Sequence, residues 1–247
     1  MSTADINYDD NFYADLVNTA GPSASVIAPM VFDMVRPDKV IDIGCGDGSW
    51  LAAFKACGAQ TIRGLDGEWL DLAVLRIPQD DFRRTDLFAP IDAGDEYDLA
   101  ISLEVAEHLP ESRAESFVRE LTKAAPVVLF SAAIPLQEGP NHINEQWPSY
   151  WARHFAANGY VPVDAIRTRV WNNQDVTWWY KQNLVLYVDE ARLNDYPALK
   201  AARDLMGPDV MDMVHPDKYR ALAKKAHPNF SRWIKSLPLV FKSRPKI

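Results

Sequence analysis

The sequence predicts an α/β fold built on a doubly wound, mostly parallel sheet, followed by a helical C-terminal extension. Short β-branched and apolar runs alternate with stretches of helical pattern, which is typical of β-α-β units. A turn with Gly44, Gly46 and Gly48 follows the first apolar run, and the strand pattern stops after residue 190. We therefore expect ligands at the carboxyl ends of the strands, where open parallel sheets hold them.

The expected elements alternate along the chain. Strands are predicted at 39–45, 61–66, 97–103 and 126–135, the segment 81–87 leads into or forms a further strand, and a closing pair is expected at 160–170 and 183–190. Helices are predicted between them at 23–35, 48–58, 112–125 and 147–159, and beyond the sheet at 196–205 and 216–226.

Length and composition are those of an ordinary globular protein. The 247 residues are 48% hydrophobic and 24% charged, which fits one domain, expected at 1–190, with an extension at 191–247. No charge-free window of 18 apolar residues and no basic-then-apolar leader is visible, so we expect neither a membrane span nor secretion. Cys45 and Cys57 are too few for a disulfide framework and fit reduced thiols in a cytoplasmic protein.

Charge is unevenly distributed along the chain. Residues 200–247 carry a net charge of +7 within a chain of net charge −8, so the preceding 199 residues carry −15. An acidic body argues against a nucleic-acid partner, which needs a basic groove. The basic and apolar segment 230–247 is expected to pack against its own domain or a second subunit of a homo-oligomer. Contact with an anionic surface is the alternative, which Pro238 and Pro245 disfavour by interrupting any helix.

Three aspartates stand in register with the glycine turn. Asp42 lies within the first strand, where its charge would repel a phosphate and suit a cationic ligand. Asp66 ends the next strand, where an acidic side chain can bind ribose hydroxyls, and Asp86 follows the third element, where it could accept from an adenine amino group. A single aspartate in such a position is more often a cap or turn residue, but all three after successive strands favour a cofactor site.

The segments VIDIGCGDG, GLDG, RRTDLF and YDLAISLEVAEHLPE together resemble class I S-adenosylmethionine-dependent methyltransferases over residues 35–190. The resemblance implies a seven-stranded sheet with one antiparallel edge strand. It also implies S-adenosyl-L-methionine as the cofactor, with its ribose on Asp66. The cofactor-binding residues expected from the motifs and the resemblance are Asp42, Gly44, Gly46, Gly48, Asp66, Asp86, Leu87 and Leu103. An NAD-linked dehydrogenase is the alternative, but the spacing here is G-x-G-x-G and not G-x-G-x-x-G.

A second group of ionisable residues follows the fourth strand in SLEVAEHLPE. On a helix, Glu104, Glu107 and His108 stand at i, i+3 and i+4 and share one face. One interpretation is a helix start, because acidic residues in a first turn favour the helix dipole. The other is a metal site, because His142 follows the neighbouring strand and the four side chains can converge on one cation.

The E-x-x-E-H motif with a later histidine resembles small-RNA 3′-terminal ribose 2′-O-methyltransferases and the O-methyltransferases of ubiquinone biosynthesis. This resemblance implies a metal on Glu104, Glu107, His108 and His142 that binds adjacent acceptor hydroxyls. Oxygen and nitrogen ligands suit Mn²⁺, Co²⁺, Fe²⁺ or Zn²⁺, and suit Mg²⁺ less well. Such a Lewis acid would lower the hydroxyl pKa and orient the oxygen. Without a metal, His142 or His108 could be the general base.

Aromatic residues point to the acceptor. Five of the eight tryptophans lie between residues 147 and 179, where most such side chains pack a core or a lid. Those beside Asn172, Asn173 and Gln174 could instead stack on a sugar ring while the amides bind hydroxyls. We predict a small-molecule hydroxyl acceptor, foremost a sugar or polyol, with a phenolic natural product or an RNA-terminal ribose as alternatives. A catalytically inactive binding or scaffold subunit is the alternative of another class.

Overall fold

The computed structural model describes the backbone of residues 10–94, 96–206 and 211–226, and the side chains within these ranges from residue 19 onward. The chain divides into two compact units, Met1–Met213 and Val214–Ile247. None of the described helices is long and apolar enough to cross a membrane. The segment 230–247 lies outside the described residues, so its packing against protein and the homo-oligomer remain predictions.

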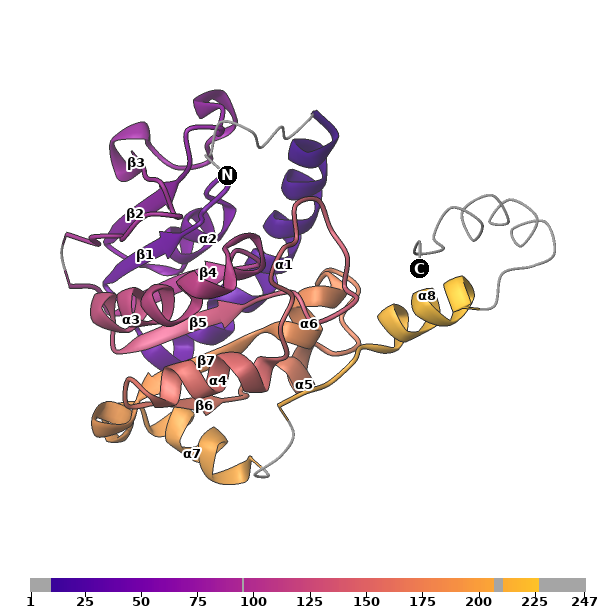
Figure 1. Ribbon diagram of the computed structural model, residues 1–247. Coiled ribbons are helices and arrows are strands. Elements are labelled where there is room, and N and C mark those ends of the chain that lie inside the picture. Colours follow the sequence, from indigo (N-terminus) through magenta and orange to yellow (C-terminus); the bar gives the residue numbers. More distant parts are fainter. Residues whose placement is uncertain (1–9, 95, 207–210, 227–247) are drawn as a thin grey trace. The chain divides into compact units, whose positions relative to one another are not determined.

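A seven-stranded sheet forms the centre of the first unit (Figure 1). The strand order is β3-β2-β1-β4-β5-β7-β6, and the neighbours are parallel except for the two pairs that involve β7. The strands are β1 (Lys39–Ile43), β2 (Thr61–Asp66), β3 (Phe82–Arg84), β4 (Leu99–Leu103), β5 (Val127–Ser131), β6 (Tyr160–Val163) and β7 (Val185–Asp189). The predicted doubly wound, mostly parallel sheet of seven strands is confirmed.

The position of the antiparallel strand corrects one expectation. The resemblance implied an antiparallel strand at the edge, but β7 lies inside the sheet between β5 and β6. The edge strand is β6, which contains Pro162. Proline has no N–H to donate, so an edge position suits it, whereas β7 pairs on both sides and is buried along almost its whole length.

Helices flank both faces of the sheet in the first unit. They are α1 (Asp10–Val35), α2 (Ser49–Cys57), α3 (Ala114–Ala124), α4 (Pro148–Ala156), α5 (Arg167–Val170), α6 (Trp178–Asn183) and α7 (Pro197–Leu205), and the second unit contains α8 (Pro216–Ala226). Short 3₁₀ turns occupy Leu72–Val74, Gln79–Asp81, Ala106–His108, Glu111–Arg113 and Glu190–Asp195. The first unit extends beyond residue 190 because α7 packs on β6 and α1, and the predicted domain division at residue 190 remains a prediction.

Alternation along the strands divides the core into two clusters. Successive side chains of a strand point to opposite faces, so Val40 of β1 packs with residues of α1 and α2, whereas Ile41 packs with residues of α3 and α4. Both strand residues are fully buried. A strand buried on both faces reads as a continuous apolar run, which explains why the sequence pattern located β1 so well.

Several strands are shorter than the apolar pattern predicts, and β5 ends at Ser131, four residues before the expected residue 135. β1 ends at Ile43 because Gly44 adopts a left-handed φ of 88°, a conformation that glycine tolerates and that turns the chain out of the sheet. β6 ends at Val163, and the expected strand residues 167–170 form α5 instead. Arg167 of α5 is fully buried. Its guanidinium donates to Asp164 and to the carbonyl of Gln182, which satisfies its hydrogen bonds outside any strand ladder.

Candidate active site

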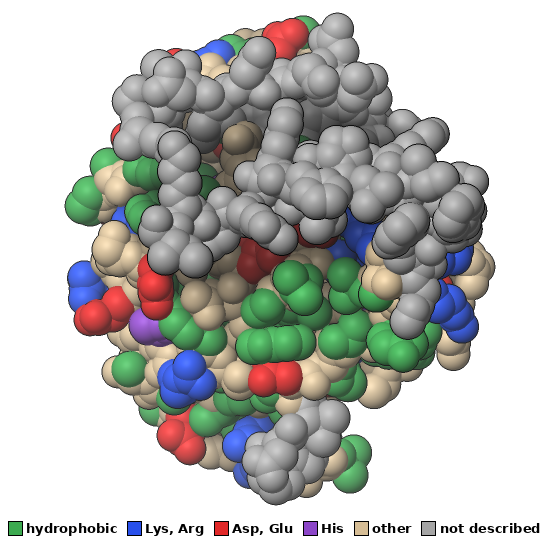
Figure 2. All heavy atoms as spheres, turned by 45° about the vertical axis from the view of Figure 1, so that its right-hand side comes forward, with side chains coloured by type: hydrophobic (Ala, Val, Ile, Leu, Met, Phe, Trp, Pro, Cys, Tyr) green, Lys and Arg blue, Asp and Glu red, His purple; other side chains and the backbone are tan. Residues whose placement is uncertain are grey.

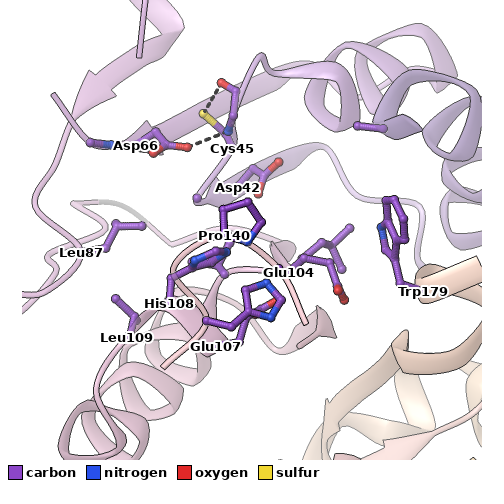
Figure 3. A pocket seen from close by; sticks show the side chains of 18 of the residues that line it. Asp42, Cys45, Asp66, Leu87, Glu104, Glu107, His108, Leu109, Pro140 and Trp179 are labelled. Atoms are coloured by element: carbon purple, nitrogen blue, oxygen red, sulfur yellow. Dashed lines mark hydrogen bonds between the residues drawn. The ribbon is translucent and has the colours of Figure 1, made fainter. Parts of the chain in front are cut away.

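A cavity of about 520 Å³ opens at the carboxyl ends of the parallel strands. This volume lies within the ordinary range of small-molecule sites. Its wall combines the loops that follow β1, β2, β3, β4 and β5 with residues of α1 and α6. Figure 3 shows Asp42, Cys45 and Asp66 on one side of the cavity and Glu107, His108 and Leu109 on the other. The topology therefore brings the two groups of candidate residues to one cavity, as expected for a crevice between β1 and β4.

The glycine turn after β1 is fastened to the end of β2. Asp66 accepts hydrogen bonds from the backbone N–H groups of Gly46 and Gly67, at 2.7 Å each. Gly44 has a φ of 88°, and a Cβ at this position would lie 2.3 Å from the Val105 side chain. A larger residue would therefore be strained by its backbone and would also collide with the loop after β4. The glycine pattern in the sequence has this steric basis.

Two buried carboxylates face the cavity from β1 and β2. Burial raises the pKa of Asp66 to about 6, although the N–H groups of Gly46 and Gly67 oppose this rise. Burial also raises the pKa of Asp42 well above its ordinary value, and the nearby Asp66 and Asp47 raise it further. Asp42 lines the cavity and has no hydrogen-bond partner among the described residues. A cationic ligand group would supply the missing partner.

Six of the eight predicted cofactor residues line this cavity: Asp42, Gly44, Gly46, Asp66, Leu87 and Leu103. Gly48 lies outside the wall, where its φ of 78° begins α2. Asp86 is exposed and accepts from the N–H of Phe88 at 3.0 Å, so it forms a turn, and its neighbours Leu87 and Phe88 face the cavity.

Three of the four predicted metal ligands come together. Glu107, His108 and His142 each offer a ligand atom, and these atoms lie within 4.8 Å of one another. The rings of the two histidines are 4.9 Å apart and nearly perpendicular. Both carboxylate oxygens of Glu107 and Nδ1 of His108 are buried without a hydrogen-bond partner in the described part of the chain. Buried polar groups are rarely left in this state, so the cluster has the character of a ligand site.

Electrostatics in the cluster follow from the same burial. Burial, together with the charge of Glu104, raises the pKa of Glu107 well above its ordinary value. Burial, helped by the nearby His142, lowers the pKa of His108 to about 4. A neutral imidazole beside a carboxylate is the form that binds a divalent cation. The donor set of one carboxylate and two imidazoles therefore fits a divalent metal such as Mn²⁺, Fe²⁺, Co²⁺ or Zn²⁺.

Glu104 corrects the helical interpretation of the E-x-x-E-H motif. The three residues do not share a helix face, because only Ala106–His108 form a 3₁₀ turn and Glu104 precedes it with a φ of 56°. Its carboxylate accepts from Gln137 at 2.7 Å and from Asn183 at 3.1 Å. Glu104 lines the cavity beside the cluster and is held by the β5 loop and α6.

The loop that carries His142 is held in place by Glu145. Glu145 accepts from the backbone N–H groups of Leu136 and Glu138, at 2.8 and 2.6 Å. Its Oε1 lies 2.9 Å from Nδ1 of His142. Leu136, Glu138 and Asn141 all have positive φ, a conformation that is costly for residues other than glycine. Strained backbone of this kind persists only where surrounding contacts hold it, as the hydrogen bonds to Glu145 do here.

Sequence reasoning missed several residues of the site. Trp69 lines the cavity, and Gln137, Asn183 and Glu145 hold its acidic and histidine side chains. Of the tryptophans between residues 147 and 179, Trp179 lines the cavity. Glu145 follows His142 by three residues, a spacing that could have suggested a carboxylate–histidine pair. No comparable signal connects Asn183 with Glu104, because 79 residues separate them.

A family model described as "Methyltransferase domain" matches residues 8–183 of the chain. Among characterised proteins, the chain is 32% identical over 79 residues to the ubiquinone biosynthesis O-methyltransferase of Ruegeria sp., covering 30% of this chain and 32% of that protein. It is 32% identical over 90 residues to the enzyme of the same name from Brucella anthropi, covering 34% and 35%. The chain thus matches about a third of the length of these relatives.

Solved structures share the fold. The sugar N-methyltransferase of Streptoalloteichus sp. superposes with a TM-score of 0.55 at 14% identity, covering 76% of this chain and 97% of that one. The magnesium protoporphyrin IX methyltransferase of Synechocystis, solved with bound S-adenosylhomocysteine, superposes with a TM-score of 0.52 at 21% identity, covering 74% and 89%. At these identities the likeness concerns the fold alone.

Proposed function

The chain belongs to the methyltransferase-domain family, whose cofactor is S-adenosylmethionine, and from this premise we propose that it methylates a hydroxyl oxygen of a small molecule. The observation that carries the proposal is one cavity with two unlike ends. One end holds the glycine turn with Asp42 and Asp66, and the other holds the unpartnered Glu107 with His108 and His142. The relatives named O-methyltransferases support transfer to oxygen.

The cofactor end suits the charges and hydroxyls of S-adenosylmethionine. We assign its cationic methionine part to Asp42 and the glycine turn, because a buried carboxylate without a protein partner attracts a cation. The ribose is assigned to Asp66, whose oxygens retain lone pairs after accepting from Gly46 and Gly67. Leu87 and Phe88 would flank the adenine, and Asp86 is left at the turn.

Transfer requires the acceptor oxygen to attack the methyl carbon while the electron pair of the breaking bond goes to sulfur. The proton of the acceptor hydroxyl must then leave. Without a metal, His142 can take it at Nε2, because Glu145 accepts from Nδ1–H and so fixes the ring in the tautomer with a free Nε2. His108 is the second candidate base, since its lowered pKa keeps the ring neutral.

Glu107, His108 and His142 would hold a divalent metal, with Glu104 beside them. A metal bound there would lower the pKa of the acceptor hydroxyl and fix its oxygen near the cofactor. The buried Glu107 oxygens support this part of the proposal, because they make no hydrogen bond of normal geometry within the described residues, and only the backbone N–H groups of Glu107 and Ala133 oppose the rise of its pKa. Glu104 already has two amide partners, so we assign it to the edge of the site and not to its centre.

A sugar or polyol remains the proposed acceptor. Adjacent hydroxyls of a sugar could both bind a metal held by Glu107, His108 and His142. Trp179 offers an aromatic face in the cavity wall for the sugar ring. Asn172, Asn173 and Gln174, predicted to bind hydroxyls, do not line the cavity, and Gln137 is the amide that does. A phenolic acceptor is the second candidate, because the apolar Leu109 and Pro140 would also suit its ring.

Turnover of the full-length protein tests the proposal. The protein is incubated with S-adenosylmethionine, Mn²⁺ and panels of methyl glycosides, polyols and catechols, and formation of S-adenosylhomocysteine is measured with and without chelator. We expect product with one panel, loss of rate on chelation and recovery with Mn²⁺. Undiminished activity in metal-free protein would leave the histidine-base mechanism alone. Tight cofactor binding without turnover in any panel would favour a binding or scaffold subunit.

A further inference from the structure

The cavity wall is rich in carboxylates. Its acidic side chains are Asp42, Asp47, Asp66, Glu104, Glu107 and Glu138. Among the described side chains of the wall there is no lysine or arginine. Asp47 is paired with Arg76 at 2.9 Å, but Arg76 stands outside the cavity. Figure 2 shows acidic side chains deep in a recess above a group of hydrophobic ones.

This charge persists when the site is filled as proposed. The cations of S-adenosylmethionine and of a divalent metal would face Asp42, Asp66, Glu104 and Glu107, whereas the exposed Glu138 has no cation assigned to it. Coulomb energies are large in a cavity of low dielectric constant and little screened by salt. An acceptor with a carboxylate or phosphate would therefore be repelled, and no cation among the described wall side chains would compensate. A built site for such an acceptor would be expected to contain arginine or lysine.

Glu138 is the exposed member of this group of cavity carboxylates. It is exposed and lines the cavity from the same loop as His142. Its backbone N–H donates to Glu145 at 2.6 Å, and its φ is 60°. A change of the side chain at this position leaves the backbone hydrogen bond to Glu145 available.

We propose that the cavity selects an acceptor that is neutral or cationic around its reacting hydroxyls and rejects carboxylated or phosphorylated ones, with Glu138 as a specificity-determining residue. The inference rests on the proposed function and narrows its substrate class to neutral glycosides, amino sugars and uncharged or amine-bearing diols. It disfavours uronates, sugar phosphates and nucleic-acid ends.

Matched ligands test the selection. One series has methyl glucoside, glucosamine and glucuronate, and another has 3,4-dihydroxybenzamide, 3,4-dihydroxybenzylamine and 3,4-dihydroxybenzoate. Affinity is measured with the full-length protein loaded with S-adenosylhomocysteine and Mn²⁺, from the fluorescence of the cavity tryptophans. In at least one series we expect the anionic member to bind at least tenfold more weakly than the neutral and cationic ones. Equal affinity for the anion, or no binding of the neutral and cationic members of either series, would overturn the proposal.

Variants of Glu138 locate the effect. In the ligand series that shows the selection, Glu138→Lys is expected to raise the affinity for the anionic member at least tenfold. Glu138→Gln is expected to raise it less, and the affinity for S-adenosylhomocysteine should stay unchanged in both variants. Glu190→Lys is the matched control, because Glu190 is exposed and lies outside the cavity wall. An equal gain in the control would show a general charge effect and exclude Glu138 as the determinant. Selective binding without turnover would instead contradict the proposed methylation while leaving the charge selection intact.

Discussion

Nδ1 of His142 lies 2.9 Å from Oε1 of Glu145, three residues further along the same loop. The same carboxylate accepts from two backbone N–H groups of that loop. Glu145 therefore fixes both the path of the loop and the orientation of the imidazole. Carboxylates in this relation to a histidine ligand orient the ring and select its tautomer.

Replacing Glu145 should uncouple metal binding from cofactor binding. In Glu145→Ala we expect Mn²⁺ affinity to fall by about 10–100-fold, because the His142 ring loses its orienting acceptor. Cofactor affinity should change little, because the glycine turn is held by Asp66. Both affinities are measured by calorimetry, with Glu190→Ala as the control. Glu145→Gln should recover part of the loss. Unchanged Mn²⁺ affinity in Glu145→Ala would show that Glu145 does not orient His142 for metal binding.

Gly139→Ala probes the same ring from the other side. A Cβ on Gly139 would lie 2.3 Å from Nε2 of His142, closer than real atoms approach, so the ring must move. We expect loss of Mn²⁺ affinity with retained cofactor affinity. Gly21→Ala is the control, because its Cβ would meet nothing closer than 3.8 Å. A Gly139→Ala protein that binds Mn²⁺ normally would show that His142 is not a ligand.

Asp66 and Asp86 should differ in their effect on the cofactor. Asp66→Ala removes the acceptor of two N–H groups beside the cavity, so we expect at least about tenfold weaker S-adenosylmethionine binding and a loss of about 1–3 kcal/mol in unfolding free energy. Asp86→Ala should weaken binding less, because Asp86 stands outside the wall. Calorimetry and urea unfolding give the two quantities. A larger effect of Asp86 would restore its predicted contact with adenine.

The raised pKa of Asp66 predicts a pH dependence of stability. The pKa of the Asp66 carboxyl is 3.8 in the unfolded chain and about 6 in the folded protein. The folded protein thus binds the proton more tightly than the unfolded chain. The stabilisation that comes from this protonation is therefore fully present below pH 3.8 and is lost as the pH rises through 6. Between pH 4.5 and 7 the unfolding free energy of the cofactor-free protein should fall by about 2 kcal/mol relative to Asp66→Asn. A constant difference between the two proteins over this range would contradict the shift.

Much of this protein was determined by local sequence. Buried parallel strands such as β1 read as apolar β-branched runs, and the run KVIDI located β1 correctly. Gly44 is required by a left-handed φ and by the Val105 side chain. Asp42 and Asp66 reach the cavity because strand ends at one edge of a parallel sheet are neighbours. For these residues, position in the chain relative to a strand end was sufficient.

Tertiary structure decided what depends on the path of loops and on distant partners. Glu104 leaves the expected helix face because its backbone takes a φ of 56° and its carboxylate bonds to Gln137 and Asn183. Asp86 turns away from the cavity to accept from Phe88. The order of β6 and β7 depends on which edge groups can pair, and Pro162 suits the edge. None of these outcomes follows from residue spacing, because each hydrogen bond competes with others that only the folded chain brings within reach.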